Sequence, residues 1–395
     1  MHILWLPSWF PTKQKPFNGI FFLEQAQALF DANLCVRVIY PDIRPLREFS
    51  FFNLKESHFQ YETCSQENLD IFYFKGWNLF PKFIKKQKDA FINKSLKLFE
   101  NYRKKYGLPD LLHAQSAIWG GLAAKVISDK YAVPFVVTEH LNVFLDKIAL
   151  SPIDSCWTTP LIKEMFLKAK GVLSVSNALN EALKTHYNQE SHKFMVMPNC
   201  VDTDFFKPSF KKSELQFKWI SISHLVELKN IFFLLRGFTK LVSLHPRTTL
   251  SIYGDGPLKK ELQKEITRLN LASHVELLGF GSREEIKNAL STSHAFVLPS
   301  QVESFGIVYI EAMASGLPVV ATNNGGANDI VLNSNGYLVN PTNEEDLVQS
   351  MLHCQANWKS FDPIAISQDV KTRFSKETFV EKHRQFYKRS LNKLD

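Results

Sequence analysis

Short runs of apolar residues alternate along the chain with longer stretches whose apolar positions repeat at helical spacing. In the first half, runs of strand length occupy residues 3–6, 36–40, 111–114, 133–138 and 171–176. Residues 19–33 and 121–131 carry the helical pattern between them. Because strands that alternate with helices usually pair in parallel, this pattern predicts repeated β-α-β units.

The same alternation restarts in the second half. Apolar runs of strand length occupy residues 218–223, 249–253, 275–278, 295–298 and 318–321. The polar stretch 202–215, which contains Pro208, separates the two halves. The sequence therefore predicts an α/β fold of two domains, residues 1–205 and residues 206–375, each built on a mainly parallel sheet.

Composition and charge narrow the class of protein. A chain of 395 residues, 45% hydrophobic and 22% charged, has the composition of an ordinary two-domain globular protein. Its five cysteines are scattered and form no C-x-x-C pair, which argues against a disulfide framework or a zinc site. No run approaches the roughly 18 apolar residues of a membrane-spanning helix, and the first residues resemble a strand rather than a signal peptide. We therefore expect a cytoplasmic protein whose net charge of +8 favours an anionic partner: a nucleotide, a nucleic acid or lipid headgroups.

One stretch, residues 299–322, combines the end of a strand, a loop, a helix and a second strand. Ser304 is placed to cap the helix and Gly316 to end it. Free backbone N–H groups and the helix dipole attract anions such as a diphosphate to a helix start. Gly306 lets such an anion approach the backbone closely. The residues expected to form this anion site are Phe305, Gly306, Ile307 and Val308.

Two glutamates flank the expected anion site. Glu303 lies just before the helix, and Glu311 lies about one to two turns inside it. One carboxylate can therefore contact a sugar and the other a ribose, with a diphosphate between them. The simpler interpretation is a buried strand–helix–strand unit that carries two solvated glutamates. A lone pair of glutamates does not distinguish these interpretations.

The sequence around the two glutamates favours the first interpretation, in which their carboxylates contact the sugar and the ribose of a donor. Residues 303–306 and 311–322 resemble, nearly letter for letter, the E-x7-E motif of the retaining glycosyltransferases of family 4, a family typical of bacterial cell-surface polysaccharide synthesis. The resemblance implies the GT-B fold, in which two Rossmann-like domains face each other across a cleft that holds the donor. It also implies that the second domain binds the nucleotide sugar and that a last helix, residues 376–395, crosses back onto the acceptor-side first domain.

The resemblance assigns roles to further residues. Lys229 matches the lysine that neutralises the donor diphosphate, and His140 matches the histidine that reaches the 6-hydroxyl of the donor sugar. Gly19 lies in the glycine-containing loop after the first strand, and Gly254 lies in a turn that frames the nucleotide base. His224 stands where the family has an arginine, so the second cationic contact to the diphosphate departs from the pattern.

We therefore expect a retaining hexosyltransferase that moves a sugar from a UDP- or GDP-linked donor to a hydroxyl of a glycan or lipid-linked acceptor, in lipid-linked glycan, lipopolysaccharide or capsule synthesis. Glu303 and His140 are the expected catalytic residues. No metal-ligand cluster is visible in the sequence, so neither a metal ion nor a cofactor is expected. Two alternatives are a nucleotide-sugar epimerase of the same fold and a basic nucleic-acid-binding protein, although no nucleic-acid-binding motif occurs.

A basic, aromatic-rich stretch at residues 75–105 bears on the acceptor. Ten lysines and arginines against two acidic residues give it a charge of +8. The pairs Ile84–Phe91 and Ile92–Phe99 are spaced as on one face of a helix. A basic amphipathic helix suits an anionic membrane surface, so we expect a peripheral enzyme on the cytosolic face of a membrane. In the alternative interpretation, the apolar face packs on the first domain and the lysines are merely solvated.

Overall fold

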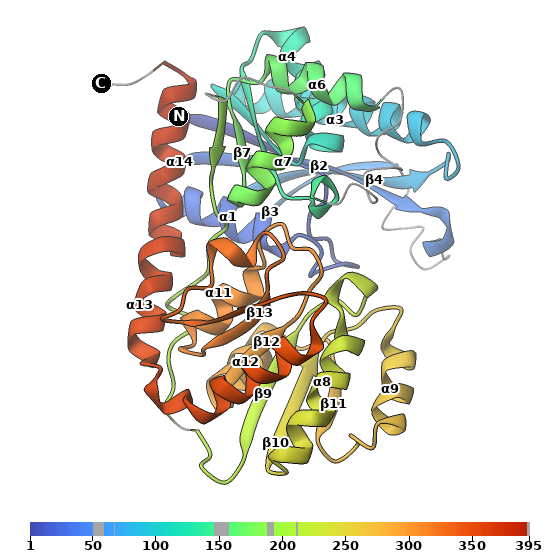
Figure 1. The fold of residues 1–395 in the computed structure, drawn as a ribbon. Helices are drawn as coiled ribbons and strands as arrows, with labels where there is room; N and C mark the ends of the chain where they lie inside the picture. Colours follow the sequence, from blue (N-terminus) through green and yellow to red (C-terminus); the bar gives the residue numbers. More distant parts are fainter. Residues whose placement is uncertain (50–58, 67, 146–157, 188–192, 211, 393–395) are drawn as a thin grey trace. The chain divides into compact units, whose positions relative to one another are not determined.

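The computed structural model describes residues 1–49, 59–66, 68–145, 158–187, 193–210 and 212–392. It divides the chain into two compact α/β units (Figure 1). The first unit comprises Met1–Val175, Asn180–Met197 and Val380–Asp395, and the second comprises Ser176–Leu179 and Pro198–Phe379. The α/β organisation in two domains with largely parallel sheets, predicted from the sequence, is confirmed.

Within the described residues, the sheet of the first unit has the strand order β3-β4-β2-β1-β5-β6-β7-β8. The strands are β1 (His2–Pro7), β2 (Cys35–Pro45), β3 (Gln60–Gln66), β4 (Leu69–Asn78), β5 (Leu111–Gln115), β6 (Phe135–Glu139), β7 (Val172–Ser174) and β8 (Phe194–Val196). The pairing of β3 with β4 is antiparallel, and the other recorded pairings in this sheet are parallel.

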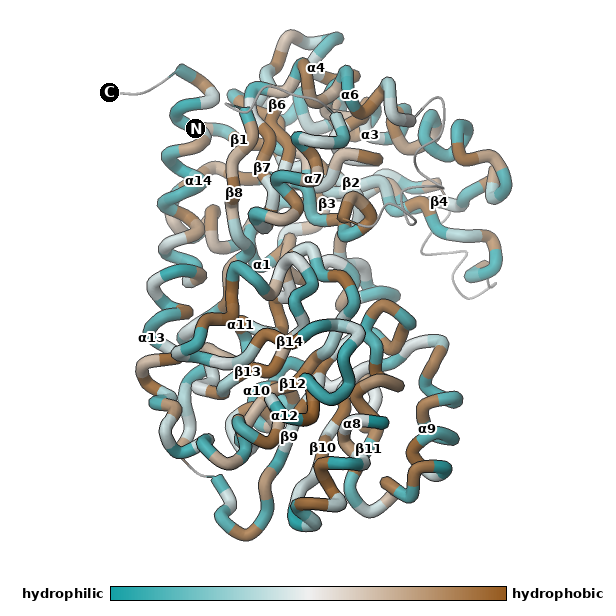
Figure 2. The backbone as a smooth tube through the Cα atoms, in the orientation of Figure 1, coloured by the Kyte–Doolittle hydropathy of each residue, from teal (hydrophilic) through white to brown (hydrophobic). Residues whose placement is uncertain are grey.

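Helices cover both faces of this sheet, with α3 and α4 on one side and α1 on the other (Figure 1). The helices are α1 (Ile20–Asp31), α3 (Ile84–Tyr106), α4 (Leu122–Tyr131), α6 (Thr158–Lys168), α7 (Asn177–Tyr187) and, from Val380 onward, α14 (Lys376–Ser390). Central strands such as β1 and β6 are therefore buried on both faces and read as continuous apolar runs, coloured largely brown in Figure 2.

The last helix is fixed to the first unit through a buried histidine. Nδ1 of His113 lies 2.7 Å from the hydroxyl of Tyr387 on α14, and its Nε2 lies 2.7 Å from Oγ1 of Thr138. Burial lowers the pKa of His113 well below its usual value, with His383 a smaller cause. Both ring nitrogens of His113 thus have protein partners, so we assign this residue to packing rather than to chemistry.

The sheet of the second unit, in the part of the chain that the structure describes, has the order β11-β10-β9-β12-β13-β14 with all pairings parallel. Its strands are β9 (Phe217–Ile222), β10 (Thr248–Tyr253), β11 (Val275–Gly279), β12 (Ala295–Leu298), β13 (Val319–Thr322) and β14 (Gly336–Val339). Its helices are α8 (Ile231–Leu244), α9 (Lys259–Arg268), α10 (Arg283–Thr292), α11 (Ile307–Ala314), α12 (Glu344–Ala356) and α13 (Pro363–Phe374).

The basic helix α3 buries its apolar side inside the first unit. Phe91, Leu98, Phe99 and Tyr102 are buried where α3 contacts β2, β4 and α4. The expectation that this apolar face meets a membrane is therefore wrong, because the face forms part of the core. No helix in the described part of the chain is long and apolar enough to cross a membrane.

Candidate active site

In the second unit, the predicted site residues gather where the strand order of the sheet reverses. After β9 the chain continues to its neighbour β10 on one side, and after β12 it continues to β13 on the other. Ligands of open α/β sheets bind beyond the carboxyl ends of the strands at such a point. The loop after β9 carries Lys229, and the loop after β12 carries Glu303. The fold thus brings together two residues that are 74 positions apart in the sequence.

Lys229 and Glu303 form an ion pair. Nζ of Lys229 lies 2.5 Å from Oε1 of Glu303, which also accepts a 2.8 Å hydrogen bond from Oγ of Ser300. The N–H of Gln301 donates to the carbonyl of Leu228 at 2.8 Å and ties the two loops together. The side chains of Lys229 and Glu303 are only 20% and 9% exposed, so solvent screens this pair less than an ordinary surface pair.

The loop that carries Glu303 is held by a neighbouring loop. The N–H of Glu303 donates to the carbonyl of Asn324 at 3.1 Å, and the N–H of Gly326 donates to the carbonyl of Glu303 at 2.8 Å. A Cβ on Gly326 would lie 2.5 Å from Cα of Phe305, so a glycine is needed where the two loops meet. The backbone at Glu303 is therefore fixed on both sides.

Helix α11 begins at a glycine cap rather than at Ser304. Gly306, with φ 95° and ψ 68°, is the N-cap residue, and no side chain caps the helix. The predicted serine cap is wrong because the chain enters the helix through a left-handed residue, a conformation that glycine adopts without strain. The side chain of Phe305 is buried, whereas Ile307 and Val308 are half-buried. This start leaves backbone N–H groups of the first turn available to an anion.

Glu311 lies inside α11, on the side that faces α10. Its side chain is 14% exposed, and its Oε1 lies 3.9 Å from Nη1 of Arg283, the first residue of α10. The adjacent residues Ile310 and Ala312 are fully buried, so the helix faces on both sides of Glu311 pack into the core. The structure therefore gives this carboxylate a cationic neighbour that the sequence did not predict.

His224 and Gly254 belong to the loops that follow β9 and β10. Gly254 has φ 137°, and a Cβ there would lie 1.7 Å from the carbonyl oxygen of Ser223, so the two loops touch through backbone. The pKa of the Asp255 carboxyl is lowered chiefly by the hydrogen bond from the N–H of Gly256 and then by the hydrogen bond and charge of Lys259, with the neighbouring His224 the smallest cause. The glycine expected to frame a nucleotide base therefore has a packing role of its own.

In the first unit, His140 directly follows β6 and is buried. Its Nε2 lies 2.9 Å from Oε1 of Gln115, and its Nδ1 has no hydrogen-bond partner among the described residues. Burial lowers the pKa of His140 to about 3, with His383 a smaller cause, so the ring is neutral at pH 7. Because the Gln115 oxygen can only accept, Nε2 carries the proton and Nδ1 is an unused acceptor.

Gly19 positions a helix beside His140. It caps α1 with φ 74°, and a Cβ there would lie 2.7 Å from Cδ1 of Trp9. The ring of Phe22, in the first turn of α1, lies edge-on to the His140 ring at a centroid distance of 4.8 Å. Gly19 thus shapes the apolar wall around His140 through tight local packing.

Three contacts of the site were missed by sequence reasoning: those made by Ser300, Gln115 and Arg283. Ser300 and Gln115 each lie at or just after the end of a parallel strand, and this position is the signal that could have found them. Arg283 on α10 lies beside Glu311 on α11, and no local sequence pattern predicts a contact between residues of two different helices.

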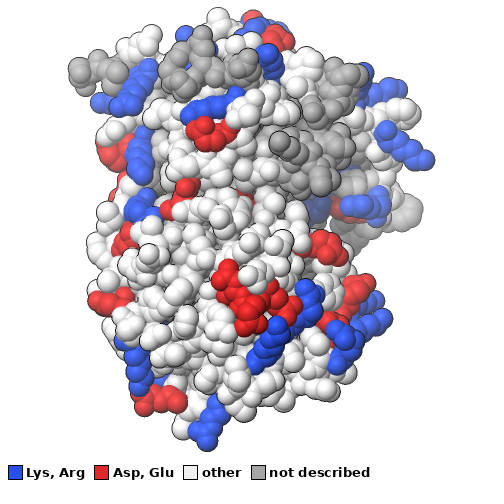
Figure 3. All heavy atoms as spheres, viewed as in Figure 1, with Lys and Arg blue, Asp and Glu red and all other residues white. Residues whose placement is uncertain are grey.

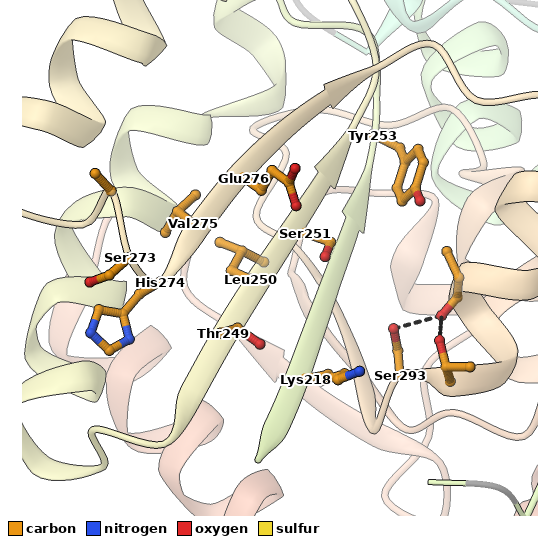
Figure 4. A pocket seen from close by; sticks show the side chains of 13 residues that line it. Lys218, Thr249, Leu250, Ser251, Tyr253, Ser273, His274, Val275, Glu276 and Ser293 are labelled. Carbon is orange, nitrogen blue, oxygen red and sulfur yellow. Dashed lines mark hydrogen bonds between the residues drawn. The ribbon is translucent and has the colours of Figure 1, made fainter. Parts of the chain in front are cut away.

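A pocket of about 450 Å³ lies elsewhere in the second unit (Figure 4). Thr249, Ser251 and Tyr253, on one face of β10, line it together with Glu276 and Lys218. None of the predicted site residues is among its lining residues. It lies along the face of the strands rather than beyond their carboxyl ends, where ligands of open α/β sheets bind. In the part of the chain that the structure describes, no three His, Cys, Asp or Glu residues are grouped so that they could hold a metal ion.

Comparisons with known proteins define the class. Residues 20–205 match the family model "Glycosyltransferase Family 4", and residues 202–360 match "Glycosyl transferases group 1". The two matches together cover most of the chain and meet near the boundary between the units. The protein is a glycosyltransferase of the GT-B type. It belongs to the glycosyltransferases of the family 4 type.

Individual relatives agree with this class. The putative teichuronic acid biosynthesis glycosyltransferase TuaC of Bacillus subtilis is 26% identical, and the alignment covers 95% of each chain. The sulfoquinovosyl transferase SQD2 of Arabidopsis thaliana is 29% identical over 269 residues, which are 62% of this chain and 50% of that protein. The match therefore spans about half the length of SQD2.

Solved structures share the fold over nearly the whole chain. Sucrose-phosphate synthase from Thermosynechococcus elongatus superposes with a TM-score of 0.78 at 18% identity, covering 98% of both chains. Anabaena HepE in complex with UDP superposes with a TM-score of 0.72 at 21% identity, covering 98% of this chain and 99% of that one. At these identities the similarity establishes the GT-B fold.

Proposed function

We propose that this glycosyltransferase moves a hexose from a nucleoside diphosphate sugar to a hydroxyl acceptor with retention of the anomeric configuration. The Lys229–Glu303 pair beside the start of α11 carries the proposal, since it places a cation, a carboxylate and free backbone N–H groups at one strand edge. Retention is what the match of residues 303–322 to the E-x7-E motif implies.

In the proposed reaction, the bond from C1 of the donor sugar to the diphosphate oxygen breaks while the acceptor oxygen bonds to C1 on the same face of the ring. The acceptor proton passes to the leaving diphosphate. Lys229 and the N–H groups at the start of α11 stabilise the charge that develops on the diphosphate. As the diphosphate takes over the ammonium of Lys229, Glu303 is released to face the positive charge that develops at C1.

The other predicted residues bind and orient the donor. Nδ1 of His140 accepts a hydrogen bond from a hydroxyl of the transferred sugar, and Glu311 accepts hydrogen bonds from the ribose hydroxyls. His224 and Gly254 belong to the loops expected beside the diphosphate and the base. The proposed chemistry calls for no metal ion or cofactor, because Lys229 and the helix N-terminus supply the positive field.

A binding panel followed by product analysis tests this function. Thermal shifts are measured with UDP, GDP and ADP and their glucose conjugates, because a ligand that binds the native state raises the unfolding temperature. UDP is the first choice, since HepE, which shares the fold, was solved with it. Proton NMR then determines the anomeric configuration of the transferred sugar in the product. An inverted product contradicts retention, and conversion of the sugar without any acceptor favours an epimerase.

We further propose that the acceptor is lipid-linked and that the enzyme works as a peripheral protein on an anionic, cytosolic membrane face. The loop between β4 and α3 supports this. Leu79, Phe80, Phe83 and Ile84 are exposed by 56%, 38%, 59% and 50%. Nζ of Lys86 lies 5.1 Å and 5.2 Å from the ring centroids of Phe80 and Phe83. Exposed apolar side chains beside lysines suit an interface where acyl chains meet anionic headgroups.

The charge around this loop agrees with an anionic partner. Figure 3 shows Lys and Arg side chains projecting at the right edge of the view, where Figure 1 places the start of α3. The loop replaces the buried face of α3 as the proposed membrane contact. We define the exposed side chains of Leu79, Phe80, Phe83 and Ile84 as the apolar tip; the first three belong to this loop, and Ile84 is the first residue of α3.

A further inference from the structure

Arg283 links the ribose side of the candidate site to two aromatic rings. Its guanidinium carbon lies 5.1 Å and 5.3 Å from the ring centroids of Phe205 and Phe206. Its Nη1 lies 3.9 Å from Oε1 of Glu311, an ion-pair distance beyond hydrogen-bond range. All four residues belong to the second unit.

Stacking on the rings of Phe205 and Phe206 restricts the position of the Arg283 guanidinium. A planar guanidinium over two rings loses much of the freedom that a long cationic side chain has on a surface. Phe206 is buried, and the side chains of Arg283 and Glu311 are 35% and 14% exposed. A fixed cation beside a mostly buried carboxylate attracts it more effectively than a mobile surface cation does.

A neighbouring lysine provides a natural comparison. Lys287 lies one turn further along α10, and its Nζ is 4.4 Å from the ring centroid of Phe205. Its recorded ion-pair partner is Glu284, at 3.4 Å, rather than Glu311. Two cations of one helix thus stack on the same ring, and of these two it is Arg283 that lies at ion-pair distance from the carboxylate of Glu311.

We infer that Arg283 is a positioning residue for ribose recognition: it holds the carboxylate of Glu311 so that its oxygens accept hydrogen bonds from the 2′- and 3′-hydroxyls of the donor nucleotide. The inference rests on the proposed function, in which Glu311 contacts the ribose. It adds that Arg283, through its stacking on Phe205 and Phe206, determines how strongly the enzyme prefers a ribonucleotide to a 2′-deoxyribonucleotide.

The test measures that preference directly. Isothermal titration gives the affinity of the full chain for the nucleoside diphosphate that binds best in the panel and for its 2′-deoxy counterpart. The variants are Arg283→Met, which keeps an apolar stem on the rings, Glu311→Gln, the double variant, and Lys287→Met as the matched control. A hydrogen bond to a charged group corresponds to about tenfold or more in affinity, so we expect wild type to prefer the ribonucleotide by at least that factor.

We expect Arg283→Met to lose most of this preference mainly through weaker ribonucleotide binding, while Lys287→Met keeps it. In the Glu311→Gln background, Arg283→Met should change the preference no further. Equal weakening of both nucleotides by Arg283→Met overturns the inference, and so does an unchanged preference. A wild-type enzyme that binds no nucleoside diphosphate refutes the proposed function instead. A preference that survives Glu311→Gln refutes the ribose role of Glu311.

Discussion

Nζ of Lys229 lies 2.5 Å from Oε1 of Glu303, so the cation expected to bind the donor diphosphate is neutralised by the carboxylate expected to face the sugar. The two roles are therefore coupled: a diphosphate that claims the ammonium also frees the carboxylate. A pair of this kind is electrostatically satisfied before the donor arrives, and the donor must compete with Glu303 for Lys229.

This coupling predicts that only one of two substitutions, Lys229→Met and not Glu303→Gln, weakens nucleoside diphosphate binding. Lys229→Met removes a charged contact and should weaken diphosphate binding by about 1.5–3 kcal/mol while leaving the free nucleoside unaffected. Glu303→Gln removes the competitor for Lys229, so diphosphate binding should stay equal or tighten. Turnover of Glu303→Gln should nevertheless fall by more than about a hundredfold, or ~2.7 kcal/mol of barrier. Calorimetry and steady-state kinetics measure both.

The free nucleoside is the control in this experiment. If Lys229→Met weakens nucleoside and nucleoside diphosphate by the same factor, Lys229 has a structural role. If Glu303→Gln keeps wild-type turnover, the assignment of Glu303 to the reacting sugar is wrong.

The buried histidine predicts a pH dependence of stability. The pKa of His140 is about 3 in the folded chain and near 6.5 when exposed, so the unfolded chain binds the extra proton between these values. The contribution of His140 is thus complete above pH 6.5 and is lost as the pH falls toward 3. Between pH 7 and pH 5 this one group should remove about 2 kcal/mol from the free energy of unfolding. Urea titrations at the two pH values measure it.

The variant His140→Gln cannot take up this proton, so its stability should fall less between pH 7 and pH 5 than that of wild type. His245→Gln, at an exposed position, serves as the control and should behave as wild type. Identical acid losses in wild type and His140→Gln would show that His140 is charged or exposed in the folded chain.

Much of this architecture could be predicted from the sequence because parallel sheets covered on both faces require continuous apolar strands. Strands β12 and β13 and helix α11 fall within residues 295–322, and their order follows from residue type alone. The cap of α11 was mispredicted because Ser304 and Gly306 are both good entry residues, and backbone conformation decided between them.

Contacts between distant segments could not be predicted in this way. Periodicity showed that α3 has an apolar face, but it could not show that β2, β4 and α4 cover that face. Likewise, no local signal joins Arg283 to Glu311, because their distance depends on how α10 and α11 pack. The sequence predicted which residues take part in the chemistry, and the structure shows which side chains lie beside them.

A close approach of two loops predicts the effect of a single methyl group. In Gly254→Ala, the new Cβ would lie 1.7 Å from the carbonyl of Ser223, so the loops after β9 and β10 must separate. In the control Gly279→Ala, φ is also positive, yet the new Cβ would meet only the flexible end of Lys259, at 3.3 Å. We expect the control to lose about 1–3 kcal/mol of stability from backbone strain. Gly254→Ala should lose clearly more, above roughly 4 kcal/mol. Equal losses in urea unfolding would contradict the close approach.

The apolar tip predicts binding to anionic vesicles. Wild type should co-sediment with vesicles of phosphatidylglycerol and phosphatidylcholine at low salt, and less so at high salt, because each lysine near the surface contributes about 1 kcal/mol. The double variant Phe83→Ser, Ile84→Ser should remain in the supernatant, since burying such a side chain contributes about 1.5–3 kcal/mol. The matched control, Phe210→Ser with Leu215→Ser, removes two apolar side chains of the second unit that are 73% and 78% exposed, and it should bind like wild type. The double variant Lys82→Glu, Lys86→Glu should also bind these anionic vesicles less than wild type does.

If wild type stays in the supernatant at low salt, the apolar tip is not a membrane contact. The same conclusion follows if both apolar double variants lose binding alike. A soluble acceptor then becomes the better proposal.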